Sequence, residues 1–230
     1  MEIKKENLNV LFVVTSCNVK GNTGIPTGFN LSEVTHPLEK LEANGIAVDI
    51  ASINGGAAPL DGLEDFNDPI NAKYWADAEF RSKIANTLKL DAVNAEKYDA
   101  IFFAGGHGAM WDFPESPAVL KIVPQFYEAG KIVSAVCHGP AALVNVKLSN
   151  GSYLVSGKNV AAFTNAEEEA VQSTNIVPFL LATTLNERGA IHHPAADWSA
   201  KVVVDGRLVT GQNPASGGGV GEALVKLLKG

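Results

Sequence analysis

Cysteine is scarce in this chain: only Cys17 and Cys137 occur among its 230 residues. Two cysteines form no disulfide framework, so in a reducing compartment each is either a small buried side chain or a working thiol. Long apolar runs are also missing. The apolar run near the N-terminus is too short to span a bilayer, and no signal-peptide cleavage pattern follows it. We therefore expect a soluble, cytoplasmic protein that does not enter a membrane.

Positive charge is scarce as well, because the formal net charge is −7 and the only basic cluster is Lys4-Lys5. This balance argues against nucleic acid and anionic membrane surfaces as partners. The dinucleotide fingerprint G-x-G-x-x-G is absent, and there is no internal repeat. With 46% hydrophobic and 19% charged residues, the chain has an ordinary globular composition. Its length predicts a single domain over residues 1–230.

Apolar runs typical of buried strands alternate with helical patterns along the chain. The expected strands are 9–15, 46–51, 100–103, 131–136 and 160–163, with a hairpin over 201–210. The expected helices are 31–43, 116–129, 139–146, 175–188 and 223–229. Ser32 is the expected N-cap of the first helix. This order predicts an α/β fold: a doubly wound, mostly parallel sheet between helices, flavodoxin-like, with ligands at the carboxyl ends of the strands.

Two regions interrupt the alternation. Residues 61–97 are rich in Asp, Asn and Ala, and we expect them to form a small helical cap insertion that could roof a pocket. Residues 172–198 are a second candidate for the rim of that pocket.

The stretch SAVCHGPAAL, residues 134–143, runs from a strand pattern through Cys137 into a helix pattern. Such a strand–turn–helix places its turn residue at the open end of the sheet, as in a nucleophile elbow. Gly139 relieves crowding there, and Pro140 suits a first helical turn. Because a thiolate at a helix N-terminus is stabilised, position marks Cys137 as reactive. The alternative is a cysteine that is simply buried.

The segment AGGHG, residues 104–108, follows another buried strand. Glycines allow the backbone to approach a ligand closely, so Gly105, Gly106 and His107 are candidates for substrate binding and for an oxyanion hole. His138 adjoins Cys137, but neighbouring side chains usually point apart, so spacing alone does not make it a catalytic base.

Acidic residues supply the remaining candidates. Glu33 lies near the start of the first helix, which faces the carboxyl ends of the strands. Its i, i+3 spacing to His36 resembles half of a metal site, but only one copy exists and we expect no metal. The run Glu167-Glu168-Glu169 is either a solvated helix start or the source of a carboxylate that orients an imidazole.

Several stretches together resemble the ThiJ/PfpI superfamily, which shares its fold with class I glutamine amidotransferases, and more narrowly its glyoxalase III and heat-shock-chaperone branch. They are FNLSEVTHPLEKL with GIAVDIAS, DAIFFAGGHGAMWDF, IVSAVCHGPAAL, AAFTNAEEE and VDGRLVTGQNPAS. Glutamine amidotransferases carry Gly-x-Cys-x-Gly and a downstream His-x-Glu. This chain has Ala135 two residues before the cysteine, and Pro194-Ala195 after His192-His193, so we do not expect glutamine hydrolysis.

The resemblance implies that Cys137 is the nucleophile, His138 its partner, and Glu33 a carboxyl within hydrogen-bond reach of the sulfur. The backbone at Gly106 and around His138 would supply oxyanion donors. Glu168 would complete the triad, with Glu167 as the alternative.

The implied activity is a glyoxalase III-type lyase of the D-lactate dehydratase type. It would convert methylglyoxal and related 2-oxoaldehydes to 2-hydroxy acids without cofactor, metal or glutathione. The Cys137 thiolate would form a hemithioacetal, and Glu33 or His138 would move the carbon-bound proton. We expect a homodimer. The alternatives are a stress-response holdase chaperone, a cysteine amidase, peptidase or deglycase, and a redox sensor.

Overall fold

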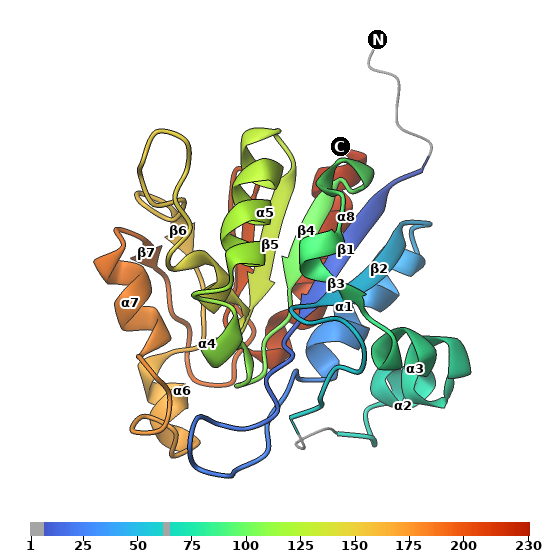
Figure 1. Ribbon diagram of the computed structural model, residues 1–230, viewed down its shortest axis with the longest axis horizontal. Helices are drawn as coiled ribbons and strands as arrows, with labels where there is room; N and C mark the ends of the chain where they lie inside the picture. Colours follow the sequence, from blue (N-terminus) through green and yellow to red (C-terminus); the bar gives the residue numbers. More distant parts are fainter. Residues whose placement is uncertain (1–6, 62–64) are drawn as a thin grey trace.

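The computed structural model describes residues 7–61 and 65–230, and its centre is a seven-stranded sheet (Figure 1). The strands lie in the order β3-β2-β1-β4-β5-β9-β8, and every neighbouring pair is parallel except β8 with β9. Their bounds are Asn9–Val14 (β1), Ala47–Ser52 (β2), Leu88–Lys89 (β3), Ala100–Phe103 (β4), Ile132–Val136 (β5), Val202–Asp205 (β8) and Leu208–Gly211 (β9). The predicted doubly wound α/β fold is confirmed.

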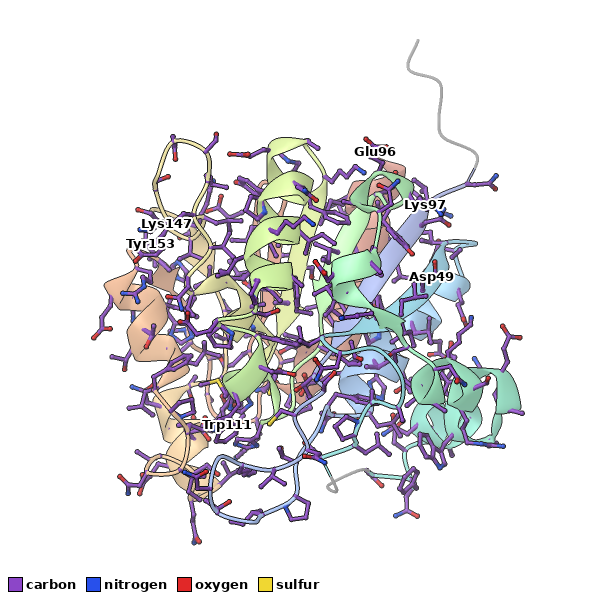
Figure 2. The ribbon with its side chains drawn as sticks, viewed as in Figure 1. Asp49, Glu96, Lys97, Trp111, Lys147 and Tyr153 are labelled. Atoms are coloured by element: carbon purple, nitrogen blue, oxygen red, sulfur yellow. The ribbon has the colours of Figure 1, made fainter. Side chains whose placement is uncertain are left out.

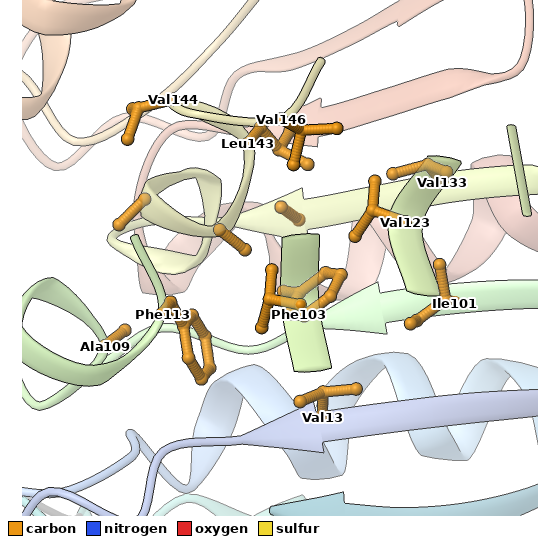
Figure 3. Packing of buried hydrophobic residues seen from close by; sticks show 14 of the residues in the cluster. Val13, Ile101, Phe103, Ala109, Phe113, Val123, Val133, Leu143, Val144 and Val146 are labelled. Carbon is orange, nitrogen blue, oxygen red and sulfur yellow. The ribbon is translucent and has the colours of Figure 1, made fainter. Parts of the chain in front are cut away.

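Both faces of the sheet are buried because the central strands are apolar throughout. In β1, Val10, Phe12 and Val14 enter one apolar cluster, whereas Leu11 and Val13 enter the other. Helices α1 (Ser32–Glu42) and α8 (Gly217–Lys229) contribute to the first cluster, and α5 (Pro117–Glu128) contributes to the second. Figure 3 shows part of the second cluster, where Phe103 and Phe113 pack beside Val13 and Ile101.

The start of α1 differs from the expectation. Leu31 is the N-cap and its side chain cannot cap the helix; the nearby Asn30 Oδ1 accepts a hydrogen bond from the Glu33 N–H (3.3 Å). The predicted cap was therefore wrong. The Ser32 hydroxyl instead accepts a hydrogen bond from the Asn71 amide, 2.8 Å away. That contact ties the start of α1 to the helix that follows β2.

Several predicted bounds change where tertiary contacts override the local pattern. Residues 139–146 form only a 3₁₀ turn over Gly139–Leu143, and residues 175–188 contain the shorter α7 (Leu181–Glu187). The expected strand 160–163 shrinks to β6 (Asn159–Val160), which pairs with β7 (Ile191–His192) in a separate small sheet. The last helix is longer than expected, since α8 begins at Gly217 despite three consecutive glycines.

The 61–97 insertion contains α2 (Pro69–Ala76) and α3 (Ala78–Ala85), apart from residues 62–64, which lie outside the described ranges. Buried Tyr74, Phe80 and Ile84 join the apolar cluster that α1 occupies. These helices therefore pack beside α1 and β2 (Figure 1). A role as the roof of a pocket stays a prediction. No helix within the described ranges is long and apolar enough to cross a bilayer.

Candidate active site

The turn after β5 holds Cys137 in a strained conformation. Its φ of 60° lies in the left-handed region that residues other than glycine seldom adopt. The backbone N–H of Cys137 donates to the Gly211 carbonyl (2.9 Å), which anchors the turn to β9. A Cβ at Gly139 would lie 2.2 Å from the Phe103 carbonyl oxygen, so only glycine allows this close approach to β4. Strain at this position has the form expected of a nucleophile elbow.

The Cys137 side chain is only 3% exposed, yet its sulfur has polar neighbours. Sγ lies 3.4 Å from Nδ1 of His138, so the turn brings these adjacent side chains into one site. Burial, followed by the charge of Glu33, raises the pKa of the Cys137 thiol well above its ordinary value, while the backbone groups of His138 and Gly106 act in the opposite direction.

One carboxylate holds two imidazoles behind the thiol. Oε2 of Glu168 lies 2.7 Å from Nε2 of His138, and Oε1 lies 2.9 Å from Nε2 of His107. Burial would raise the pKa of Glu168, but these hydrogen bonds outweigh it and lower the pKa to about 2. Because an ionised carboxylate only accepts, both Nε2 atoms carry protons. Nδ1 of His138 faces the thiol, and when Nε2 carries the only ring proton this atom can accept the thiol proton.

The imidazole of His138 is also held between rings. Its centroid lies 4.3 Å from those of both His107 and Phe163, and Trp198 packs edge-on against Phe163 at 5.8 Å. Burial, together with the charge of His138, lowers the pKa of His107 to about 4, so this ring is neutral. His138 is thereby fixed in both orientation and tautomer.

Helix α6 (Asn165–Ala170) settles which glutamate faces the imidazoles. Thr164 and Glu167 form a reciprocal capping box at its start. Glu167 Oε1 also accepts hydrogen bonds from the Trp198 backbone and from Asn213, so this residue is fully occupied. The sequence pattern Thr-x-x-Glu is the signal that separates the two glutamates, because it assigns Glu167 to the cap and leaves Glu168 for the site.

Glu33 reaches the thiol from the other side. It is fully buried on α1, and its Oε2 accepts a hydrogen bond of 2.7 Å from the Gly105 N–H. Oε1 has no partner of ordinary hydrogen-bond geometry among the described residues. Burial raises the pKa of Glu33 to about 8, although interactions with the Cys137 thiol and the Gly105 N–H partly counteract this rise. The carboxyl group therefore exchanges its proton near neutral pH.

The loop after β4 lies against the elbow. A Cβ at Gly105 would lie 2.6 Å from Oε2 of Glu33 and 2.7 Å from the backbone nitrogen of His138. Glycine is therefore needed at this position for the carboxyl end of β4 to approach the carboxyl end of β5. Gly106 has a φ of 96° and contributes its backbone to the surroundings of the sulfur. The His107 imidazole faces Glu168, a contact that the sequence did not predict.

Metal-type ligands converge at one place in the part of the chain that the structure describes. Ligand atoms of His107, His138 and Glu168 all lie within 4.8 Å of one another, and all three side chains are buried. Their hydrogen bonds to one another already satisfy these atoms. The other pair considered from the sequence does not converge, because Nε2 of His36 pairs with Asp68 (3.1 Å) while Glu33 faces the thiol.

Proteins from Saccharomyces cerevisiae, Candida albicans and Francisella tularensis are among those that are similar to this chain over nearly its whole length. It is 32% identical to "Glutathione-independent glyoxalase HSP31" of Saccharomyces cerevisiae over 219 residues, which cover 90% of this chain and 92% of that protein. The solved structure of glyoxalase III from Candida albicans matches with a TM-score of 0.86 and 29% identity, covering 95% of this chain and 96% of that one. Rapid Encystment Protein 24 kDa from Francisella tularensis matches with a TM-score of 0.92 and 41% identity, covering 96% and 99%.

A family comparison agrees with these matches and with the elbow geometry. The model of the DJ-1/PfpI family matches residues 24–227, which include α1, the elbow and the small-sheet region. The predicted resemblance to the ThiJ/PfpI superfamily is confirmed, and the chain belongs to the DJ-1/PfpI family.

Proposed function

We propose that this chain is a glutathione-independent glyoxalase that converts methylglyoxal and related small 2-oxoaldehydes to 2-hydroxy acids. The observation that carries this proposal is the buried Cys137 thiol, which lies between the Glu33 carboxyl and the His138 imidazole. The names of the yeast and Candida relatives support it. The overall reaction adds one water to the aldehyde and needs no external oxidant or reductant.

The first step joins the sulfur to the aldehyde carbon. Nδ1 of His138 accepts the thiol proton as Sγ attacks the aldehyde carbon, and the protonated Glu33 carboxyl donates its proton to the aldehyde oxygen, which completes the hemithioacetal and leaves Glu33 as a carboxylate. The imidazolium formed in between lies against ionised Glu168. Because Glu33 is mostly protonated at neutral pH, it does not repel the transient thiolate.

The second step moves a proton between neighbouring carbons. The Glu33 carboxylate left by the first step removes the hydrogen from the sulfur-bearing carbon, and the His138 imidazolium protonates the former ketone oxygen. The Glu33 carboxyl group, whose pKa is about 8, then gives a proton to the former ketone carbon and takes the proton of the aldehyde-derived hydroxyl, so that a carbonyl forms on the sulfur-bearing carbon. Backbone N–H groups at Gly106 and His138 stabilise the enediolate oxygen. The product of this step is a thioester of the 2-hydroxy acid on Cys137.

The third step releases the acid. A water molecule attacks the thioester carbonyl while His138 takes one of its protons, and the thiol leaves with a proton returned by the imidazolium. The products are the 2-hydroxy acid, which is lactate when the substrate is methylglyoxal, and free enzyme. With these three steps, the proposed enzyme is a lyase of the D-lactate dehydratase type.

The low exposure of Cys137 favours this function over the alternatives. A thiol that is 3% exposed admits a small aldehyde more readily than a peptide or a glycated protein side chain. A holdase chaperone would use exposed apolar surface instead and would not need the thiol. We further propose that the protein works in the cytoplasm, a reducing compartment that suits a chain whose two cysteines are unpaired. We also propose that it forms a homodimer, as the family resemblance implies.

The test is lactate formation from methylglyoxal with glutathione left out, using purified wild type and Cys137→Ala. We expect wild type to form lactate stoichiometrically and the variant to form none above the uncatalysed rate. Suppression of client aggregation, measured in parallel, should persist in the variant if a chaperone activity exists. Wild type that suppresses aggregation but produces no lactate contradicts the proposal.

A further inference from the structure

The loop between β1 and α1, residues 16–28, lies against the loop and short helix that follow β4. The Ser16 N–H donates to Asp112 of α4 (Ala109–Asp112), and the Gly108 N–H donates to the Gly28 carbonyl (3.3 Å). A Cβ at Gly21 would contact the Trp111 indole at 3.1 Å. Trp111 lies at the end of the molecule where β4 and β5 finish (Figure 2). The loop is therefore fixed at the same end of the sheet as Cys137.

Lys20 is the only charged residue of this loop. It is half-buried, and its Nζ lies 3.5 Å from the Ser173 hydroxyl. The Ser173 N–H in turn donates to the Glu168 carbonyl (3.0 Å), so this contact lies one turn beyond the triad carboxylate. Among the described residues, no carboxylate oxygen forms an ion pair with Nζ of Lys20.

Electrostatic interactions link Lys20 to groups of the site. Burial lowers the pKa of Lys20, while the negative charges of Glu168 and Asp61 oppose that change. The ammonium group also lowers the pKa of His107. Asp61, for its part, raises the pKa of Glu33. Lys20 is therefore within electrostatic range of both Glu168 and Asp61, and no carboxylate among the described residues forms an ion pair with it.

We propose that Lys20, supported by Ser173, forms an anion-binding subsite that takes a carboxylate or similar anionic end group of a 2-oxoaldehyde bound at Cys137. This assignment rests on the proposed glyoxalase function. A half-buried lysine without an ion-pair partner is stabilised when an anionic ligand replaces water around it. The subsite therefore predicts a preference for 2-oxoaldehydes with an acidic side chain over neutral analogues of similar length.

The experiment compares kcat/KM for 4,5-dioxopentanoate, which ends in a carboxylate, with that for its methyl ester. We expect Lys20→Met to lower the acid-to-ester ratio by about tenfold or more, the usual effect of losing a charge-assisted hydrogen bond. Lys20→Arg should keep most of the ratio. The ester serves as an internal control for folding, since a structural role of Lys20 would reduce both substrates equally.

Lys97→Met is the matched control, because Lys97 lies at the opposite end of the molecule from Trp111 (Figure 2). It should leave both rates unchanged. An acid-to-ester ratio that is the same in wild type and Lys20→Met overturns the proposal.

A second readout needs no turnover. The ratio of Cys137 alkylation rates with iodoacetate and iodoacetamide, followed on the Cys137 peptide by mass spectrometry, should fall in Lys20→Met and stay constant in Lys97→Met. If wild type forms no lactate, the proposed function fails while this ratio still decides the subsite. A ratio that Lys20→Met leaves unchanged counts against the subsite even in an active enzyme.

Discussion

At the scale of single residues, Glu33 and Cys137 form a pair in which each influences the ionisation of the other. The charge of Glu33 helps to raise the pKa of the Cys137 thiol. Glu33→Gln removes that charge, so we expect the pH profile of thiol alkylation to move to lower pH. Iodoacetamide labelling of the Cys137 peptide across a pH series measures the shift. A superimposable profile would show that the two groups do not communicate.

The two buried glutamates of α6 should separate in their effects. Glu168→Gln removes the anion behind His138 and should reduce kcat by about 10²-fold or more with a modest change in stability. Glu167→Gln disturbs the capping box and the contacts to Trp198 and Asn213, so we expect a loss of about 1–2 kcal/mol in the free energy of unfolding. Urea denaturation and steady-state kinetics on both variants test this; equal effects in both assays would contradict it.

At the residue scale, the sequence predicted where Cys137 lies in the fold, and its catalytic role stays a prediction. Cys137 was identified because a strand, a thiol and a glycine-proline turn occur together, and the structure places it at the strained turn. The preference for Glu168 over Glu167 came from the family resemblance. The pattern from Thr164 to Glu167 is itself typical of a capping box, which would assign Glu167 to the start of the helix. The contact between His107 and Glu168 joins residues 61 positions apart, and no local spacing predicts such a pairing.

At the scale of elements, the elbow depends on the absence of a side chain at Gly139. Gly139→Ala would place a methyl group 2.2 Å from the Phe103 carbonyl, and we expect it to cost about 1–3 kcal/mol of stability as well as activity. Gly218→Ala in α8 is the matched control, since its Cβ meets only the Lys40 side chain at 3.9 Å. That change should be neutral or stabilising by up to about 1 kcal/mol. Thermal unfolding of both variants measures these changes in stability. A Gly139→Ala protein that is as stable as wild type would refute the packing argument.

Element types were predictable from the sequence, but several ends were not. The strand over Ala100–Phe103 was predicted with its observed bounds, because a short apolar run leaves no other choice. The helix expected over 139–146 failed because Gly139 is packed against β4, which favours a short 3₁₀ turn. The helix expected from residue 175 begins at Leu181, after a turn in which Ser173 accepts the Ile176 and Val177 N–H groups.

At the scale of the whole molecule, two apolar clusters enclose the sheet, and the acidic site lies where α1, β4 and β5 meet. Burying Glu33 links this site to global stability. Its folded-state pKa of about 8 exceeds its ordinary value of 4.5, so its contribution is fully present below about pH 4.5 and is lost as the pH rises through 8.

Glu33→Gln should therefore gain stability relative to wild type between those pH values, by a few kcal/mol at most. Urea unfolding at several pH values measures this difference, and a single transition by two probes would also support one domain over residues 1–230. A difference that does not change with pH would mean that Glu33 ionises normally in the folded protein.

The most direct test of the central claim is mass spectrometry of the Cys137 peptide from enzyme quenched during turnover of methylglyoxal without glutathione. The account predicts a substrate-derived thioester or hemithioacetal on Cys137 that appears before lactate and decays with it. Lactate formed at the normal rate with Cys137 unmodified throughout, or formed equally well by Cys137→Ala, would contradict covalent catalysis at this sulfur.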